Sequence, residues 1–483
     1  RIIAILYVAL ATLFVAMTFI AGILPGKYEI ALLVIVGIIT FFLLPRLFLQ
    51  RIRKLKKIIA TVIAVIFCIV YGIGNYYLIV TAGFFGNIFG TTEKIVYDVV
   101  VLESSPYENL NDLEGETIYM LAGGDDTYQE AKQNVLLDGK DVSVEEATES
   151  VNINGLCEGL FKRDFKAILI TDGNYDIQCN INSSYEEKTR IIYQTTIVRS
   201  TDATSDKDVT SEPFNILISG NDNFGEIADT ARSDVNIVMS VNPVSKKVLL
   251  TTLPRDSYLP LATSGQLDKL THSGILGIDE TIKTVENALD IDIDFYLKAD
   301  FTAVINLVDA LGGIEVVSDY SFTTSGRQNN GYSFTEGVNY LNGEEALAFS
   351  RERHAFGDGD FQRGRHQQLV LEAIIKKATS STAILTRYGS ILSSISDYMM
   401  TSMPTGDIKA LVKMQIDGMP TWSIDKNEVE GTPIRAESYL GGGQVLSVTR
   451  LDSEAVLEAR KKIYTVTELT DKLNEINQTQ GAS

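Results

Sequence analysis

Three long apolar runs near the N-terminus constrain this 483-residue chain more than any other feature. Ile2 to Leu24 contains 23 consecutive uncharged residues, Ile30 to Pro45 contains 16, and a third uncharged run extends from Ile58 to Thr92. A membrane-spanning helix needs about 20 apolar residues, so the first and third runs suffice, and the second does when Leu47 to Leu49 extend it. The runs are too long for a cleaved signal peptide, and they lack a small-residue cleavage site. The sequence therefore predicts a three-helix membrane anchor over residues 1–80.

Basic side chains between the second and third runs predict the orientation of this anchor. Loops rich in lysine and arginine stay on the cytoplasmic side of a membrane. We therefore expect a multi-pass protein of the cytoplasmic membrane whose large C-terminal domains are extracytoplasmic. The basic residues of this loop are Arg46, Arg51, Arg53, Lys54, Lys56 and Lys57.

The part of the chain that follows the anchor is strongly acidic. Residues 1–80 carry eight basic side chains and one acidic one, a net charge of +7, so the total of −20 leaves −27 for the remaining residues. Nucleic-acid binding requires a broad basic surface. This balance excludes a nucleic-acid partner and requires that any bound anion meet a local group of arginines.

A small α/β domain is expected after a membrane-interface segment, 81–92. We assign residues 93–199 to this accessory domain because strand patterns occur at Asp98–Leu102 and Thr117–Leu121, followed by a helix that starts near Thr127. The short polar residues of the segment 200–212 are typical of a linker.

The remaining segment, 213–480, predicts an α/β/α sandwich with a mixed sheet. FNILISG, from Phe214 to Gly220, has the length and apolarity of a buried strand, and Val235–Val241 with Lys247–Leu253 predicts a hairpin. Strands and helices alternate irregularly, which favours a mixed sheet over a purely parallel one. The helices expected here are Asp279–Leu289, Phe301–Leu311, Gly343–Ser350, Gly364–Ala378, Ala383–Ser394 and Ser453–Glu475.

Two cysteines lie outside the apolar runs. Cys157 and Cys179 either pair, since an extracytoplasmic compartment permits disulfides, or remain two buried free thiols. The sequence contains no C-x-x-C and no H-E-x-x-H spacing, so it predicts no zinc site.

The segment SRERHAFGDGDFQRGRHQQ, from Ser350 to Gln368, is unusual in so acidic a chain. It holds four arginines and two of the three histidines of the protein. Arg351 and Arg353 are two positions apart, so they share a face if the segment is extended, which is the geometry we expect. Arg363 and Gln367 share a face of the helix that follows.

Charged residues also stand at the ends of three predicted strands. Asp222 follows the strand FNILISG, Arg232 and Asp234 precede the next strand, and Arg255 with Asp256 follows the third. The guanidinium group of one arginine can bind two phosphate oxygens at once. Carboxylates repel a nearby phosphate unless a Mg²⁺ ion lies between them. A network of ion pairs without any ligand has the same composition, and composition alone leaves both interpretations open.

Several motifs in one order resemble the LytR-CpsA-Psr family of cell-wall glycopolymer transferases. They are ARSDVNIVMSVNPVSKKVLLTTLPRDSYLP, KLTHSGILG, GVNYLNGEEALAFSRERH and DGDFQRGRHQQ. The resemblance extends from Phe214 to the C-terminal helices, and the anchor with its accessory domain resembles the capsule-biosynthesis CpsA branch. Family members often have R-S-D-T where this chain has Val235 after Asp234.

The resemblance implies a catalytic domain that binds a polyprenyl diphosphate lipid in an apolar pocket and uses Mg²⁺. It implies that Asp222 and Asp234 bind the metal. It also implies catalytic roles for Asp234, Arg255, Arg351 and Arg353, and a supporting position behind the arginines for Asp256 and Asp360. The residues expected at the diphosphate are Arg232, Arg255, Arg351, Arg353, Arg363 and Gln367.

The implied reaction is a phosphotransfer that attaches a lipid-linked polysaccharide, in this branch capsular polysaccharide, to peptidoglycan. Hydrolysis of the diphosphate is an expected side activity, and other capsule-assembly proteins are expected partners. A non-catalytic binder of the lipid-linked precursor, which regulates capsule chain length or assembly, is the alternative. A transcriptional regulator is disfavoured because the cytoplasmic segments are too short for a helix-turn-helix.

Overall fold

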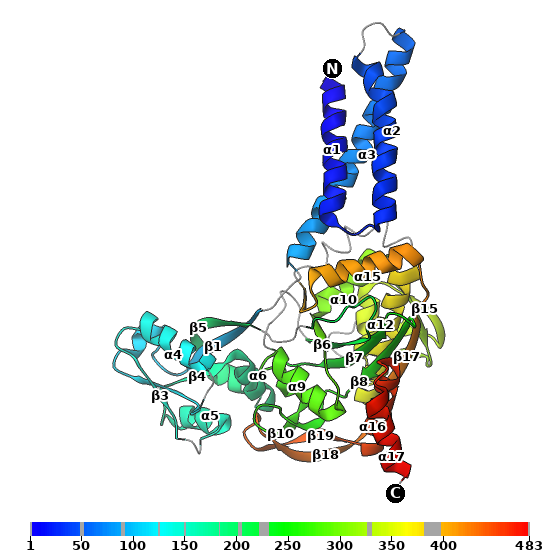
Figure 1. The fold of residues 1–483 in the computed structure, drawn as a ribbon. Coiled ribbons are helices and arrows are strands. Elements are labelled where there is room, and N and C mark those ends of the chain that lie inside the picture. The colour runs from blue at the N-terminus through cyan, green and yellow to red at the C-terminus, as the bar shows by residue number, and fades with distance from the viewer. Residues whose placement is uncertain are drawn as a thin grey trace.

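The computed structural model describes residues 2–48, 53–87, 92–123, 126–148, 151–182, 184–200, 205–221, 231–325, 331–380 and 398–481. Three apolar helices project from a two-domain body (Figure 1): α1 (Ile2–Ala21), α2 (Gly26–Phe48) and α3 (Lys54–Asn87). All three are long and apolar enough to cross a membrane, with mean hydropathies of 2.5, 2.5 and 2.3. Few polar groups join them, among them the amide of Asn75, which donates to the Leu10 carbonyl over 3.1 Å. The three expected apolar helices are confirmed.

The accessory domain is a five-stranded sheet in the order β3-β2-β4-β1-β5. The central strand β4 (Ala167–Thr171) is buried throughout, because apolar residues cover both of its faces. β2 runs parallel to β3 and β4, whereas β1 runs antiparallel to β4 and β5. The other elements are β1 (Thr92–Leu102), β2 (Thr117–Met120), α4 (Asp126–Asp138), β3 (Ser143–Glu146), α5 (Ile153–Lys162), α6 (Asp172–Ile181), α7 (Tyr185–Lys188) and β5 (Thr189–Ser200).

The thiols of Cys157 on α5 and Cys179 on α6 are both free in the structure. Cys157 is buried and accepts a hydrogen bond from the Tyr185 hydroxyl over 3.2 Å. Of the two expectations for these cysteines, the structure has the free thiols.

The C-terminal domain is built on a six-stranded sheet in the order β16-β11-β6-β7-β8-β17. β6 pairs in parallel with β11 and β8 with β17, while the remaining pairs are antiparallel, so the sheet is mixed as predicted. Its strands are β6 (Phe214–Gly220), β7 (Val235–Asn242), β8 (Lys247–Thr252), β11 (Phe295–Ala299), β16 (Met399–Thr401) and β17 (Ser423–Glu428).

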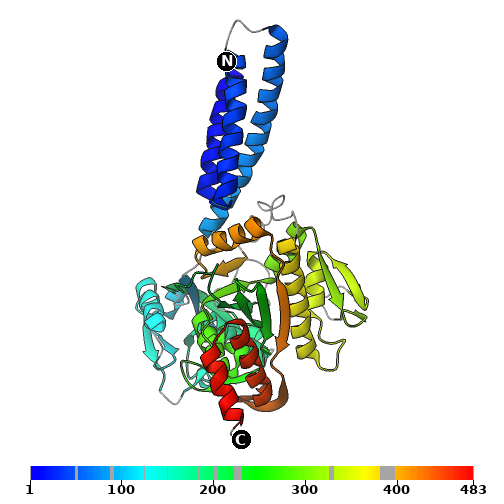
Figure 2. The same ribbon diagram turned by 45° about the vertical axis from the view of Figure 1, so that its right-hand side comes forward.

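Helices cover both faces of this sheet and make the predicted sandwich (Figure 2). Alternate residues of β6 point to opposite faces: Leu217 joins the core beneath α9 and α16, and Ile216 joins the core beneath α12 and α15. A third core lies between α10, α11, α12 and the pair β12–β15. These elements are α9 (Ile278–Leu289), α10 (Phe301–Leu311), β12 (Ile314–Ser318), β15 (Gly337–Leu341), α11 (Gly343–Arg351), α12 (Gly359–Ser380), α15 (Thr405–Gly418), α16 (Ser453–Val466) and α17 (Thr470–Gly481).

Three local expectations are wrong. Arg351 is the last residue of α11 and not part of an extended segment; the chain becomes extended only at Glu352. The helix expected to begin at Gly364 begins five residues earlier, because α12 starts at Gly359 and continues through Gly364. The predicted helix Ser453–Glu475 is two helices, separated at Glu468, whose φ of 59° is incompatible with a right-handed helix. The expected helix Ala383–Ser394 lies outside the described residues.

The described part of the predicted linker packs on the C-terminal domain. Val209 is buried, and Lys207 donates to Asp294, a carboxylate near the start of β11, over 2.9 Å. This segment therefore packs near the start of β11 before β6 begins.

Candidate functional site

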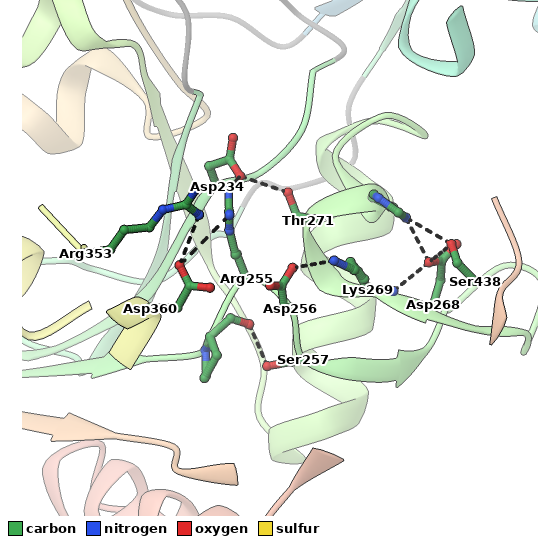
Figure 3. Close-up of polar contacts among 12 residues, drawn as sticks. Asp234, Arg255, Asp256, Ser257, Asp268, Lys269, Thr271, Arg353, Asp360 and Ser438 are labelled. Carbon is green, nitrogen blue, oxygen red and sulfur yellow. Dashed lines mark hydrogen bonds and ion pairs between the residues drawn. The ribbon is translucent and has the colours of Figure 1, made fainter. Parts of the chain in front are cut away.

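Charged side chains from four separate segments meet at one end of the main sheet (Figure 3). Asp234 immediately precedes β7, and Arg255 follows the end of β8, the neighbouring strand. Arg353 follows α11, while Asp360 lies in the first turn of α12 with Arg363 three residues later. Because β7 and β8 are antiparallel partners, the start of one and the end of the other lie side by side.

Asp360 is the point on which three guanidinium groups converge. Its Oδ1 lies 3.2 Å from Arg363, 3.7 Å from Arg353 and 3.9 Å from Arg255. None of these contacts has the geometry of a hydrogen bond, and the buried Oδ1 makes no hydrogen bond at all. Asp360 therefore attracts the three cations without accepting a hydrogen bond from any of them.

Asp234 holds Arg255 from the other side. Arg255 Nη1 donates to Asp234 Oδ1 over 2.9 Å, and the hydroxyl of Thr271 donates to the same oxygen over 3.3 Å. Both recorded contacts use Oδ1, and the second carboxylate oxygen of Asp234 points away from Arg255 and Thr271 (Figure 3).

The electrostatics of the cluster favour an additional negative charge. Three guanidinium groups face the two carboxylates of Asp234 and Asp360, and the Arg363 side chain is only 12% exposed. Burial, followed by the neighbouring charge of Arg255, lowers the pKa of Arg363. Burial also opposes the charge of Arg255, but Asp234, Asp256 and Asp360 outweigh it and raise its pKa. The cluster thus has more positive charge than its own carboxylates neutralise.

A short helix, α8 (Leu270–Ser273), supplies contacts that the sequence analysis did not assign. Besides its hydroxyl bond to Asp234, Thr271 exchanges backbone hydrogen bonds with the site: its N–H donates to the Arg255 carbonyl over 2.8 Å, and its carbonyl accepts from Ser233 N–H over 3.0 Å. Lys269 lies 3.0 Å from Asp256 and neutralises it. The motif KLTHSG contained both residues, but nothing in their spacing distinguishes them from ordinary surface residues.

His272, in the same motif, contacts groups outside the arginine–aspartate cluster. Its Nδ1 lies 2.8 Å from Asp268 Oδ1, and Ser438 lies on the same side. This arrangement holds the hairpin of β18 (Gly431–Ser438) and β19 (Gln444–Leu451) against α8.

The remaining predicted site residues lie around this cluster or outside the described chain. Arg232 is half-buried two residues before Asp234. The Arg351 guanidinium stacks on the Phe301 ring, 4.2 Å from its centroid, at the start of α10. Gln367 is half-buried on α12, one turn after Arg363. Asp222 lies outside the described residues. The structure thus brings together Asp234, Arg255, Arg353, Asp360 and Arg363.

The described part of the chain contains no group of three or more metal-binding side chains. Asp234 nevertheless fits the way Mg²⁺ is often bound, through one or two carboxylates completed by water and substrate phosphates. Its second carboxylate oxygen is the atom that fits this role.

A family model matches residues 178–462, more than half of the chain, and it is described as the LytR_cpsA_psr family. The chain belongs to the LytR_cpsA_psr family. The match includes every residue of the arginine–aspartate cluster and leaves out the three apolar helices and most of the accessory domain. The LytR_cpsA_psr resemblance seen in the motifs is thereby confirmed.

Several curated relatives carry the name polyisoprenyl-teichoic acid–peptidoglycan teichoic acid transferase TagU. The protein from Bacillus anthracis is 37% identical over 194 residues, which are 40% of this chain and 61% of that protein. The protein from Halalkalibacterium halodurans is 37% identical over 218 residues, 45% of this chain and 65% of that protein. This chain therefore spans less than two thirds of the length of either LytR_cpsA_psr relative.

Solved structures also match about half of the chain. The crystal structure of B. subtilis TagV is 28% identical, with a TM-score of 0.45, over 53% of this chain and 98% of that one. A structure entitled "TagT bound to LI-WTA" is 26% identical, with a TM-score of 0.44, over 55% of this chain and 94% of that one.

Proposed function

We propose that this protein is a membrane-anchored phosphotransferase that attaches a lipid-linked glycopolymer to peptidoglycan. The observation that carries the proposal is the convergence of Arg255, Arg353 and Arg363 on a single carboxylate oxygen, with their hydrogen-bond donors unused by it. The names of the TagU relatives, which describe transfer of teichoic acid to peptidoglycan, support the reaction class.

The ligand that fits the cluster best is the diphosphate of a polyprenyl diphosphate lipid. Guanidinium groups bind phosphate oxygens bidentately, and several forks are needed to hold two linked phosphates. In the proposal the diphosphate contacts Arg255, Arg353 and Arg363, with Arg232, Arg351 and Gln367 around it. Asp256 and Asp360 hold the arginines from behind.

The proposed step is a displacement at the phosphorus that carries the glycan. A hydroxyl oxygen of the acceptor sugar forms a new O–P bond, the bond from that phosphorus to the bridging oxygen breaks, and polyprenyl phosphate leaves with the bonding electrons. The hydroxyl proton passes to a base that we do not assign. Negative charge accumulates on the transferring group, where Arg255 and Arg353 stabilise it. Water in place of the acceptor gives diphosphate hydrolysis as a side reaction.

Asp234 is the described residue that would hold Mg²⁺ in this proposal, together with Asp222. A bound Mg²⁺ neutralises charge on the phosphate oxygens. Asp234 would present its second carboxylate oxygen to the ion. Arg255 and Thr271 bind the other oxygen and thereby fix the orientation of the carboxylate.

In the proposal, the anchor holds the site on the outer face of the membrane, where both substrates are found. The basic residues between α2 and α3 favour a cytoplasmic loop, which puts the accessory and C-terminal domains on the outer face of the membrane beside peptidoglycan. The polymer we propose is capsular polysaccharide, with other capsule-assembly proteins as partners. The motif likeness to the CpsA branch supports this choice.

Native mass spectrometry of the detergent-purified full chain, combined with a transfer assay, tests the proposal. We expect wild-type protein to retain added undecaprenyl diphosphate, and Arg255→Ala to lose both the lipid and the transfer of lipid-linked glycan to a peptidoglycan fragment. Arg365→Ala is the matched control, because Arg365 lies on the same helix but pairs with Asp358 and Glu428. Wild-type protein that binds lipid but transfers nothing would favour a non-catalytic precursor binder. Wild-type protein that binds no lipid would refute the proposal.

A further inference from the structure

The accessory domain contacts the C-terminal domain at several points, among them the short loop Gly274–Gly277, which joins α8 to α9. α6 of the accessory domain lies beside this region (Figure 1). Ile177 on α6 packs with Ile275 of the loop and with Leu261 and Leu440 in a buried apolar cluster. A side chain at Gly173, also on α6, would overlap Ile275. The loop is therefore in close contact with a domain that contributes none of the site residues.

A buried carboxylate of the accessory domain caps the helix that follows this loop. Glu93 on β1 is only 1% exposed, and its Oε1 accepts the backbone N–H of Ile278, the first residue of α9, over 2.9 Å. An anion at the N-terminus of a 12-residue helix also interacts favourably with the helix dipole. Lys298, on β11 of the C-terminal domain, lies 4.0 Å from the same oxygen.

Arg199 on β5 completes this junction. Its Nη2 lies 3.1 Å from Glu93 Oε2 and donates to the carbonyl of Leu276 over 2.9 Å. Gly277 lies between them with a φ of 109°, and a Cβ there would overlap both the Arg199 and the Glu93 side chains. The loop backbone is thus bonded on either side of Gly277, because Glu93 accepts the N–H of Ile278 and Arg199 donates to the carbonyl of Leu276.

The opposite side of the same loop touches the site backbone. A Cβ on Gly274 would lie 2.5 Å from the Ala231 carbonyl oxygen and 2.8 Å from the Ser233 nitrogen. α8, which precedes the loop, bonds Ser233 and Arg255 through the backbone of Thr271 and Asp234 through its hydroxyl. A displacement of the loop therefore moves the residues that orient Asp234 and Arg255.

We propose that the accessory domain positions the arginine–aspartate site, and that Glu93 is the positioning residue, acting with Arg199 through the loop Gly274–Gly277. The inference concerns the site of the proposed function. It rests on that function only where the binding of a diphosphate ligand is measured. It gives the accessory domain a role: whatever binds or displaces that domain changes the geometry of the site, because the loop is shared.

Hydrogen–deuterium exchange on the detergent-purified full chain tests the proposal. In Glu93→Ala we expect peptides containing Ile278, Thr271 and Ser233 to exchange about tenfold faster, because a charge-assisted hydrogen bond is lost. Gly277→Ala is the second variant, since it keeps Glu93 and Arg199 but places a methyl group where they meet. Glu114→Ala is the control, because it removes an exposed ion pair with Lys140 on the same domain.

The binding readout uses geranylgeranyl diphosphate as a probe of the site. We expect its Kd to rise about tenfold in Glu93→Ala and Gly277→Ala and to stay unchanged in Glu114→Ala. Faster exchange confined to Ile278, with Ser233 and Thr271 still protected in both variants, would overturn the inference and leave Glu93 as a simple helix cap. If wild-type protein does not bind the probe, the proposed function fails, whereas the exchange at Ser233 and Thr271 still decides this inference.

Discussion

Arg255 and Asp234 lie 21 positions apart in the sequence and 2.9 Å apart in space, guanidinium Nη1 to carboxylate Oδ1. Their side chains are 19% and 10% exposed, so the pair is largely removed from solvent. Removing one member of such a pair leaves an incompletely compensated charge, which costs more than the loss of a surface ion pair. The pair therefore couples stability of the C-terminal domain to the orientation of the site.

Replacing Asp234 by asparagine tests this coupling. We expect the free energy of unfolding to fall by about 2 kcal/mol, because Asp360 compensates Arg255 only in part. Urea unfolding followed by the fluorescence of Trp422, the only tryptophan, reports on this domain. Asp425→Asn, an exposed position on β17, is the control and should leave the midpoint unchanged. A variant as stable as wild type would show that the pair contributes no net stability. If Asp234 holds the metal, the variant should also lose any dependence of transfer on Mg²⁺.

Replacing Asp360 by asparagine should strengthen anion binding while it weakens catalysis. The change removes one negative charge within 4 Å of three guanidinium groups, and we expect the Kd for inorganic pyrophosphate to fall about tenfold. Transfer should decrease, because the arginines lose the carboxylate that holds them in place. Isothermal titration at two salt concentrations measures the first effect. Asp358→Asn, which affects only the exposed pair with Arg365, is the control. Weaker pyrophosphate binding would mean that Asp360 acts mainly by preorganising the arginines.

The accessory domain should lose stability as the pH rises from 4 to 6. Burial raises the pKa of Asp98 from 3.8 to about 6, although the bond from Gln194 opposes this shift. The folded state therefore keeps a proton that the unfolded state has already released, and stability falls with pH across this window by about 2 to 3 kcal/mol. Asp98→Asn should remove that slope and raise the melting temperature at pH 7. Asp164→Asn, at an exposed position of the same domain, should keep the slope.

His366 should produce the opposite slope in the C-terminal domain. Its ring stacks on Phe322 at 5.0 Å between centroids, and burial lowers its pKa from 6.5 to about 4. In the unfolded state His366 binds a proton below pH 6.5, whereas in the folded state it binds one only near pH 4. The free energy of unfolding therefore falls by about 3 kcal/mol as the pH decreases through this range. Trp422 fluorescence in urea measures it. The slope should vanish in His366→Phe and persist in His354→Gln, since His354 is exposed. Its persistence in His366→Phe would assign the effect to another group.

Elements with strong local patterns were predictable. Phe301–Leu311 and Phe214–Gly220 appear in the structure with the expected bounds, because a run of apolar residues at one period specifies its own secondary structure. The end of α11 was not predictable: Ser350 to Arg353 carries no apolar period, and the packing of α11 against α10 and α12 decides where the helix stops.

Some residues of the candidate site could be predicted from the sequence and others could not. Its arginines and Asp234 were recognisable from motifs whose residues are close in sequence. Thr271, Lys269 and Glu93 were not, since their roles depend on contacts between segments 13 to 185 positions apart.

The sequence by itself determined the three apolar helices, the strands of the main sheet and the concentration of arginine between Ser350 and Gln368, because each depends on neighbouring residues. Only the tertiary structure decided that Arg255, Arg353 and Arg363 share Asp360, and that Glu93 of one domain caps α9 of the other. The packing of α12 against β8 and the docking of α6 on the loop Gly274–Gly277 create these contacts, and neither is encoded in any local pattern.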